Sequence, residues 1–164
     1  MATEGAVHES VAHLVPLLGT WRGEGHGDYP TIESFDYTDE WEFVAPPGKP
    51  FVRFTQRTRD AAGLPKHTEA GYLRCPSPGV VEIVAALPTG QAECGRGTVE
   101  AGAELVLATD AAVLNTDSAK RVDRIVRRFS VRWDSLAYSM EMAAVDVGLT
   151  LHLTATLYRA DDLP

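Results

Sequence analysis

The chain has 164 residues, of which 45% are hydrophobic and 23% are charged, and its formal net charge is −8 at pH 7. That length suits one domain with a core of its own, so we expect residues 1–164 to form a single domain in which residues 1–10 are flexible. The excess of acidic residues argues against a nucleic acid or an anionic membrane surface as the main partner.

The sequence also argues against several locations and metal sites. No apolar run is long enough for a transmembrane helix, and the first residues lack the basic and apolar regions of a secretory signal. Cys75 and Cys94 show no C-x-x-C spacing, which argues against a zinc or thiol-redox site. A reducing cytoplasm is therefore the expected location.

The elements are predicted in chain order from periodicity and turn chemistry. Apolar residues at helical spacing predict a short helix over residues 9–18. Strand-like segments then follow one another without a helical insert, which indicates an antiparallel barrel or sandwich. The expected fold is all-β, a ten-stranded antiparallel barrel of the lipocalin or calycin type with a short N-terminal helix, wide enough for one ligand. The expected strands span residues 19–26, 33–44, 51–59, 67–75, 80–87, 91–100, 104–109, 122–133, 136–145 and 149–159.

The last two strands differ in how clearly they assign an inner face. In 136–145 one parity holds Tyr138, Met140 and Met142, and this set is the natural inner face. In 149–159 the same rule turns the leucines inward and His152 outward. His152 could serve an interior site if the outer side of the strand were covered by the 9–18 helix or by a second subunit. An exposed leucine face on this strand would favour a homodimer.

Residues 19–32 contain glycines at positions 19, 23, 25 and 27 around Trp21. Glycine weakens an ordinary strand, so this density indicates either a sharp bend or backbone lying close to a large flat ligand. The five histidines show no H-x-H or H-E-x-x-H spacing, and each could simply be a surface residue or a satisfied core residue. A haem, in contrast, needs only one nitrogen ligand and an apolar slot.

Read as G-x-W-x-G-x-G followed by Y-P-T-I, residues 19–32 resemble the opening motif of the nitrobindin family of haem-binding β-barrels. The strand around His152, with H-L-x-A-x-L, resembles the family strand whose histidine ligates the haem iron. The segment from His67 to Tyr72 resembles the family pattern H-x-E-x-G-Y, whose histidine lies on the other side of the haem. The resemblance covers nearly the whole chain.

The resemblance implies roles for five residues. His152 would be the metal ligand and act in catalysis through the iron, and His67 would be the distal residue. Thr31, Lys120 and Met142 would complete the cofactor site, as a pocket-lining residue, a residue near the haem edge and a residue packed near the porphyrin. The cofactor would be one haem b per chain. Its ferric iron would isomerise peroxynitrite to nitrate and would also bind nitric oxide.

Each residue also has an interpretation that involves no haem. Met140 and Met142 could be ordinary core residues, Thr31 could cap a turn, and Lys120 could be a solvated charge. Trp21 is expected to plug the barrel against the N-terminal helix under either interpretation. The alternative function is a non-catalytic carrier of a fatty acid or another small apolar ligand, since the fold alone does not decide between them. A third possibility is an empty barrel used for protein contacts.

Overall fold

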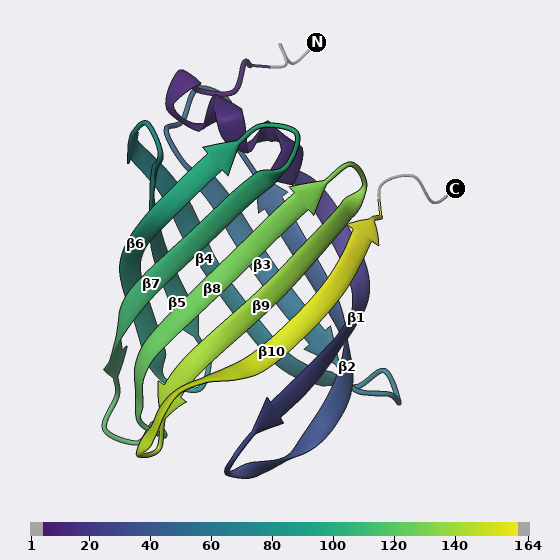
Figure 1. The fold of residues 1–164 in the computed structure, drawn as a ribbon, viewed down its shortest axis with the longest axis vertical. Helices are drawn as coiled ribbons and strands as arrows, with labels where there is room; N and C mark the ends of the chain where they lie inside the picture. Colours follow the sequence, from purple (N-terminus) through teal and green to yellow (C-terminus); the bar gives the residue numbers. More distant parts are fainter. Residues whose placement is uncertain (1–4, 161–164) are drawn as a thin grey trace.

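The structure, a computed structural model, describes residues 5–160, whose ten strands form one closed barrel (Figure 1). Each strand is antiparallel to its two neighbours, and β1 closes the barrel by pairing with both β2 and β10. The predicted all-β barrel is thereby confirmed. Its strands are β1 (Gly19–Tyr29), β2 (Ile32–Val44), β3 (Val52–Arg59), β4 (Pro65–Ser77), β5 (Val80–Leu87), β6 (Gln91–Ala101), β7 (Leu105–Asn115), β8 (Val122–Arg132), β9 (Ser135–Ala144) and β10 (Val147–Arg159).

The predicted helix is present as a 3₁₀ helix, η1 (Glu9–Leu17), which lies across one end of the barrel (Figure 1). Its buried side chains are Val11, Leu14 and Leu17. The indole nitrogen of Trp21 donates a hydrogen bond to the carbonyl of Leu17 over 2.8 Å, and Trp21 is fully buried. The expected plug is therefore present. Residues 1–4 of the segment expected to be flexible lie outside the described residues.

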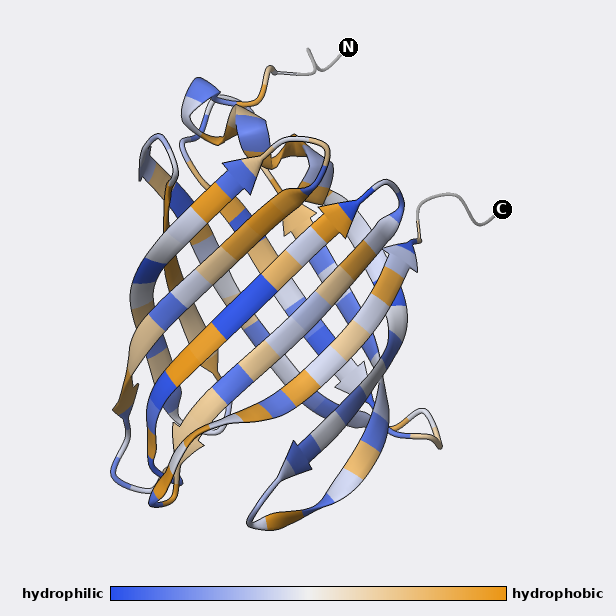
Figure 2. Cartoon of the chain, viewed as in Figure 1, coloured by the Kyte–Doolittle hydropathy of each residue, from blue (hydrophilic) through white to orange (hydrophobic). Residues whose placement is uncertain are grey.

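The interior is divided along the barrel axis. Hydrophilic and hydrophobic residues alternate along the strands, as the pleat requires (Figure 2). Near η1 the inner face is filled by packed aromatic and aliphatic side chains, including Trp41 stacked on Phe43 with ring centroids 5.5 Å apart. Trp41 also contacts Tyr138 at 5.0 Å. This half of the barrel is a solid core, so a ligand site can lie only towards the opposite end.

The assignment of faces in β10 corrects the sequence prediction. The β9–β10 register shifts between Leu151 and Leu153, where two steps along β10 oppose one step along β9. This extra residue is a β-bulge, which reverses the parity of the strand on one side of it. Leu153 consequently keeps its inward position while His152 also reaches the interior, and Leu151 is left exposed. The bulge, and not a covering helix, resolves the conflict, since η1 lies over β4 and β7.

No helix within residues 5–160 is long and apolar enough to cross a membrane.

Candidate functional site

A cavity of about 770 Å³ occupies the end of the barrel opposite η1. This volume lies within the range of ordinary cofactor and ligand sites. Its wall is formed by residues near the ends of several strands and by the turns that join them. The lining residues are Tyr29, Thr31, Ile32, Phe35, Tyr37, Gln56, Thr58, Lys66, His67, Glu69, Leu87, Thr89, Gln91, Ser118, Lys120, Arg121, Val122, Ile125, Met140, Met142, Ala144, Val145, His152 and Leu153.

All five residues that the sequence predicted for the site line this one cavity. Thr31 lies in the turn between β1 and β2, His67 on β4, Lys120 just before β8, Met142 on β9 and His152 on β10. Residues up to 121 positions apart in the chain are therefore brought to a common wall, from Thr31 to His152.

The imidazole of His152 is held in one orientation. Its Nδ1 lies 3.0 Å from the carbonyl oxygen of Asp28, which can only accept, so Nδ1 carries the proton and donates. The edge-on rings of Tyr29 and Phe35 flank it, with centroids 5.3 Å and 6.4 Å away. Burial lowers the pKa of His152 below its usual value, although the hydrogen bond to Asp28 acts in the opposite direction. The ring is thus neutral at pH 7, with the Nε2 lone pair free to ligate a metal.

Two of the glycines of β1, Gly25 and Gly27, serve a different purpose from the one expected. A side chain at Gly25 would meet the ring of Tyr37 at 2.3 Å, and one at Gly27 would meet the ring of Phe35 at 2.2 Å. The flat groups that approach this backbone are therefore aromatic rings of β2, which are brought against β1. Gly27 therefore acts on the site indirectly, because it allows Phe35 to lie beside His152.

His67 faces the cavity from another part of the wall. Its backbone nitrogen donates to Thr58 Oγ1 over 3.0 Å, which anchors this part of β4 to β3. Its Nε2 lies 3.2 Å from Oε2 of Glu69, two residues further along the same face of the strand. The side chain of His67 is half-buried, whereas that of Glu69 is almost completely buried.

Beneath the cavity lies a buried ionic cluster, formed by Arg127, Glu69 and Glu93, which the sequence analysis did not predict. Arg127 is fully buried and donates from Nη1 to Glu69 over 2.5 Å and from Nη2 to Glu93 over 2.7 Å. Its Nη1 also donates to the hydroxyl of Tyr138 over 3.0 Å. Buried charges are tolerated when they are paired and hydrogen-bonded in this way.

The two carboxylates of the ionic cluster respond differently to burial. Burial alone would raise the pKa of Glu69, but the charge of Arg127 and the hydrogen bonds from His67 and Arg127 outweigh it and lower the pKa. For Glu93 burial prevails, and its pKa is raised. Glu69 is therefore the carboxylate that stays ionised, in contact with Arg127 and His67.

A third buried carboxylate, Asp39, lies next to this cluster. Gln56, which lines the cavity, donates to Asp39 over 2.9 Å, and the indole of Trp41 donates over 3.1 Å. Burial raises the pKa of Asp39 to about 7, although both hydrogen bonds act to lower it. The nearby hydroxyl of Tyr37 is buried without a hydrogen-bond partner among the described residues, and Tyr37 also lines the cavity. The inner end of the cavity is consequently polar.

The rim of the cavity is cationic although the chain as a whole is acidic. Lys66, Lys120 and Arg121 all line it. The carbonyl of Lys120 accepts a hydrogen bond from Gln91 over 2.8 Å, which fixes the loop before β8. Asn115 reinforces this loop by bonding both the carbonyl and the nitrogen of Val122. Arg121 is already paired with Asp123 over 2.7 Å, so the charge that can attract carboxylates or small anions comes mainly from Lys66 and Lys120.

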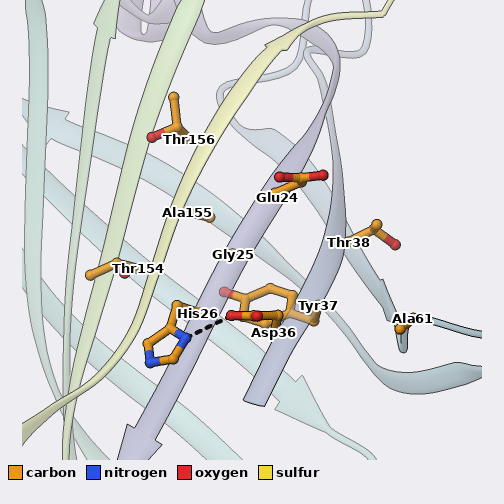
Figure 3. A pocket seen from close by; sticks show the side chains of 10 residues that line it. All are labelled: Glu24, Gly25, His26, Asp36, Tyr37, Thr38, Ala61, Thr154, Ala155 and Thr156. Atoms are coloured by element: carbon orange, nitrogen blue, oxygen red, sulfur yellow. Dashed lines mark hydrogen bonds and ion pairs between the residues drawn. The ribbon is translucent and has the colours of Figure 1, made fainter. Parts of the chain in front are cut away.

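A second hollow lies on the outside of the barrel across β10, β1 and β2 (Figure 3). Nδ1 of His26 lies within hydrogen-bond distance of Oδ1 of Asp36 there, at 2.7 Å, and both side chains are largely exposed. None of the predicted site residues lines it. This pair provides an outside histidine with which His152 can be compared.

The donor set fits a haem better than a bare metal ion. Within residues 5–160 no three His, Cys, Asp or Glu side chains are grouped to hold an ion. One oriented imidazole beside Met140, Met142, Ile125 and Leu153 does meet the need of a haem for a single axial nitrogen in an apolar slot. A cationic rim suits the two propionates of haem b. The fold and the cavity together define a closed antiparallel barrel whose open end has the size and lining that a haem requires.

Comparison with known proteins gives the same class. Residues 10–159 match the family described as "THAP4-like, heme-binding beta-barrel domain". The chain therefore belongs to this family of haem-binding barrels, the nitrobindin family.

Individual relatives cover nearly the whole chain. It is 50% identical to a protein named peroxynitrite isomerase from Nocardia farcinica, over 94% of this chain and 93% of that protein. It is 45% identical to peroxynitrite isomerase 1 of Mycolicibacterium paratuberculosis, over 93% of this chain and 96% of that protein. The crystal structure of Rv2717c from M. tuberculosis superposes with a TM-score of 0.90 at 40% identity, covering 94% of this chain and 99% of that one.

Proposed function

We propose that this barrel, as one domain, binds one haem b per chain through Nε2 of His152 and isomerises peroxynitrite to nitrate. The observation that carries the proposal is the hydrogen bond from Nδ1 of His152 to Asp28, which keeps the Nε2 lone pair available for ligation in a ring that lines the cavity. The family of the chain and the names of its relatives support the same conclusion. When bound, ferric haem supplies an electron-poor iron that attracts the peroxynitrite anion, weakens its O–O bond and also binds nitric oxide.

The residues of the chain would divide the remaining work. Met142 would pack near the porphyrin and exclude water, so that the fragments of the substrate recombine before they escape. Lys120 at the rim would pair with a propionate, and Thr31 would complete the pocket wall. His67 would be the distal residue, near the bound substrate. The rim cations would raise the local concentration of an anionic substrate on an otherwise acidic protein.

Adding hemin to the purified protein should give a ligated Soret band that saturates at one haem per chain. Mixing the ferric complex with peroxynitrite in a stopped-flow instrument should then speed its decay in proportion to complex concentration, with nitrate as the product. A spectrum typical of non-coordinated hemin, or a decay rate equal to that in buffer, would contradict the proposal. A carrier of fatty acids would instead bind its ligand equally well with or without His152.

We also infer that the chain forms a homodimer and works in the cytoplasm. Leu149 and Leu151 are 37% and 51% exposed on the outer side of β10, next to the bulge that carries His152. Light scattering after gel filtration should give twice the chain mass of 17.8 kDa, and replacing both leucines with serine should give the monomer. A wild-type monomer at micromolar concentration would refute the dimer. Cys75 and Cys94 are both free thiols, which suits a reducing compartment.

A further inference from the structure

His67 and the buried ionic cluster form a single chain of contacts that starts at the cavity and ends deep in the barrel. Nε2 of His67 contacts Oε2 of Glu69 at 3.2 Å, and Glu69 in turn accepts from both terminal nitrogens of Arg127, over 2.5 Å and 3.2 Å. Glu93 accepts from Nε and Nη2 of Arg127 and the hydroxyl of Tyr138 from Nη1, and neither of them makes a hydrogen bond to His67. The carboxylate of Glu69, which contacts His67, is therefore itself held in place by Arg127.

The protonation of Glu69 decides which nitrogen of His67 carries the proton. An ionised carboxylate only accepts hydrogen bonds, and the guanidinium of Arg127 only donates them. Glu69 is ionised because Arg127 stabilises its charge. The contact between His67 and Glu69 is then a hydrogen bond only if Nε2 of His67 is the donor. In the neutral ring this leaves Nδ1 as the atom with a free lone pair.

We propose that Glu69, held by Arg127, is a positioning residue that fixes His67 in the Nε2–H form and so offers Nδ1 to the cavity as a proton acceptor. The arrangement is the same in kind as a buried carboxylate that orients a catalytic imidazole. It differs from a distal histidine that donates a hydrogen bond to a ligand on the iron.

The accepting Nδ1 of His67 would also take part in the reaction, a step that rests on the proposed function. An accepting Nδ1 can take the proton of peroxynitrous acid, giving the peroxynitrite anion and an imidazolium ion that lies beside the carboxylate of Glu69. The proton returns to solvent when the imidazolium loses it. The same neutral ring, with its one N–H directed at Glu69, would offer no hydrogen bond to a molecule in the cavity that can only accept one.

The substitution Glu69→Gln tests the proposal in the haem-free protein. An amide has one accepting oxygen and one donating nitrogen, and Arg127 requires the oxygen. The amide nitrogen then faces His67, whose Nε2 has to accept. We expect neutral His67 to be the Nε2–H form in the wild type and the Nδ1–H form in E69Q. Nitrogen-15 correlation spectra of the imidazole ring at pH 8 distinguish the two forms, with His67 assigned from the peak that H67F lacks.

The matched control is Glu93→Gln, which alters the same buried ionic cluster without touching His67. E93Q should keep the Nε2–H form, because Arg127 and Glu69 still pair. The proposal is overturned if the wild type itself shows the Nδ1–H form, if E69Q keeps the wild-type form, or if E93Q changes it as E69Q does. The wild-type measurement alone decides the matter should E69Q fail to fold.

A measurement on the haem-loaded protein separates this inference from the proposed function. At pH 8 the Nδ1–H form of E69Q should donate a hydrogen bond to azide on the ferric haem and bind it several-fold more tightly than the wild type, as about 1 kcal/mol for one hydrogen bond implies. A changed ring form with unchanged azide affinity would support the positioning by Glu69 and refute the distal role of His67.

Discussion

Replacing His152 with alanine should abolish tight haem binding while leaving the barrel folded. The imidazole supplies the proposed axial ligand, and His152 is only half-buried beside an existing cavity, so truncation enlarges a space that is already open. Loss of partners in the outer shell of a metal site alone costs roughly 10–100-fold in affinity, and loss of the ligand itself should exceed this. A hemin titration followed at the Soret band measures the change.

The histidine on the outer face provides the control for this experiment. His26 lies on the neighbouring strand β1 and pairs with Asp36 in the exposed hollow, away from the cavity (Figure 3). H26A should therefore bind hemin like the wild type. Added imidazole should partly restore the ligated Soret band of H152A, because the cavity can admit it. Equal hemin affinity in H152A and the wild type would remove the basis of the haem assignment.

The second large effect concerns Asp39, whose replacement by asparagine should stabilise the protein increasingly as the pH rises. The folded protein keeps the Asp39 proton up to about pH 7, whereas an unfolded aspartate releases it near a pKa of about 3.9. Between these values the folded state binds more protons, so the stability of the wild type falls as the pH rises. Asparagine cannot ionise and avoids this loss.

The size of the effect follows from the shift in the pKa of Asp39. A difference of about three units corresponds to roughly 4 kcal/mol once the group is fully ionised, of which about half is already present at pH 5.5. We therefore expect the stability advantage of D39N to grow by about 2 kcal/mol between pH 5.5 and pH 8. Urea unfolding at the two pH values measures this difference.

A neighbouring aspartate, Asp36, tests whether the pH-dependent gain in stability of D39N arises from the burial of Asp39. Asp36 lies on the same strand, but its side chain is 89% exposed. D36N should show no comparable gain between pH 5.5 and pH 8. If D39N and D36N changed the free energy of unfolding by the same amount at both pH values, Asp39 would have to be ionised in the folded protein well below pH 7.

Much of the fold could be predicted from the sequence because each strand has a local signal, the alternation of apolar and polar residues between turn residues. The barrel and the inner face of β9 follow from alternation and turn residues, whereas the plug at Trp21 was expected from the role of the G-x-W tryptophan in lipocalin-like barrels. The bulge at His152 could not be predicted in this way, since an extra residue in β10 is defined only against its partner β9. Parity alone therefore placed His152 on the outer face. The family resemblance placed it in the interior, and the bulge explains how it reaches the interior.

The buried ionic cluster was missed although the sequence carried a signal for it. Arg127 lies between Ile125 and Phe129 on the inner parity of its strand, and Asp39 precedes Trp41 in the same way. A charged residue on an inward parity indicates a buried partner of opposite charge or a protonated state. Which partners meet could not be deduced, because Glu69 and Arg127 are 58 residues apart.

The buried ionic cluster lies between the packed half of the barrel beside η1 and the cavity at the other end, so stability and ligand binding are assigned to different parts of the molecule. The packed half beside η1 carries the stability of the fold, so the open half is free to vary in shape, charge and occupant. A molecule built in this way can lose its guest without collapsing. New specificities could arise by changes at the rim alone, which makes this barrel a promising scaffold for engineered pockets.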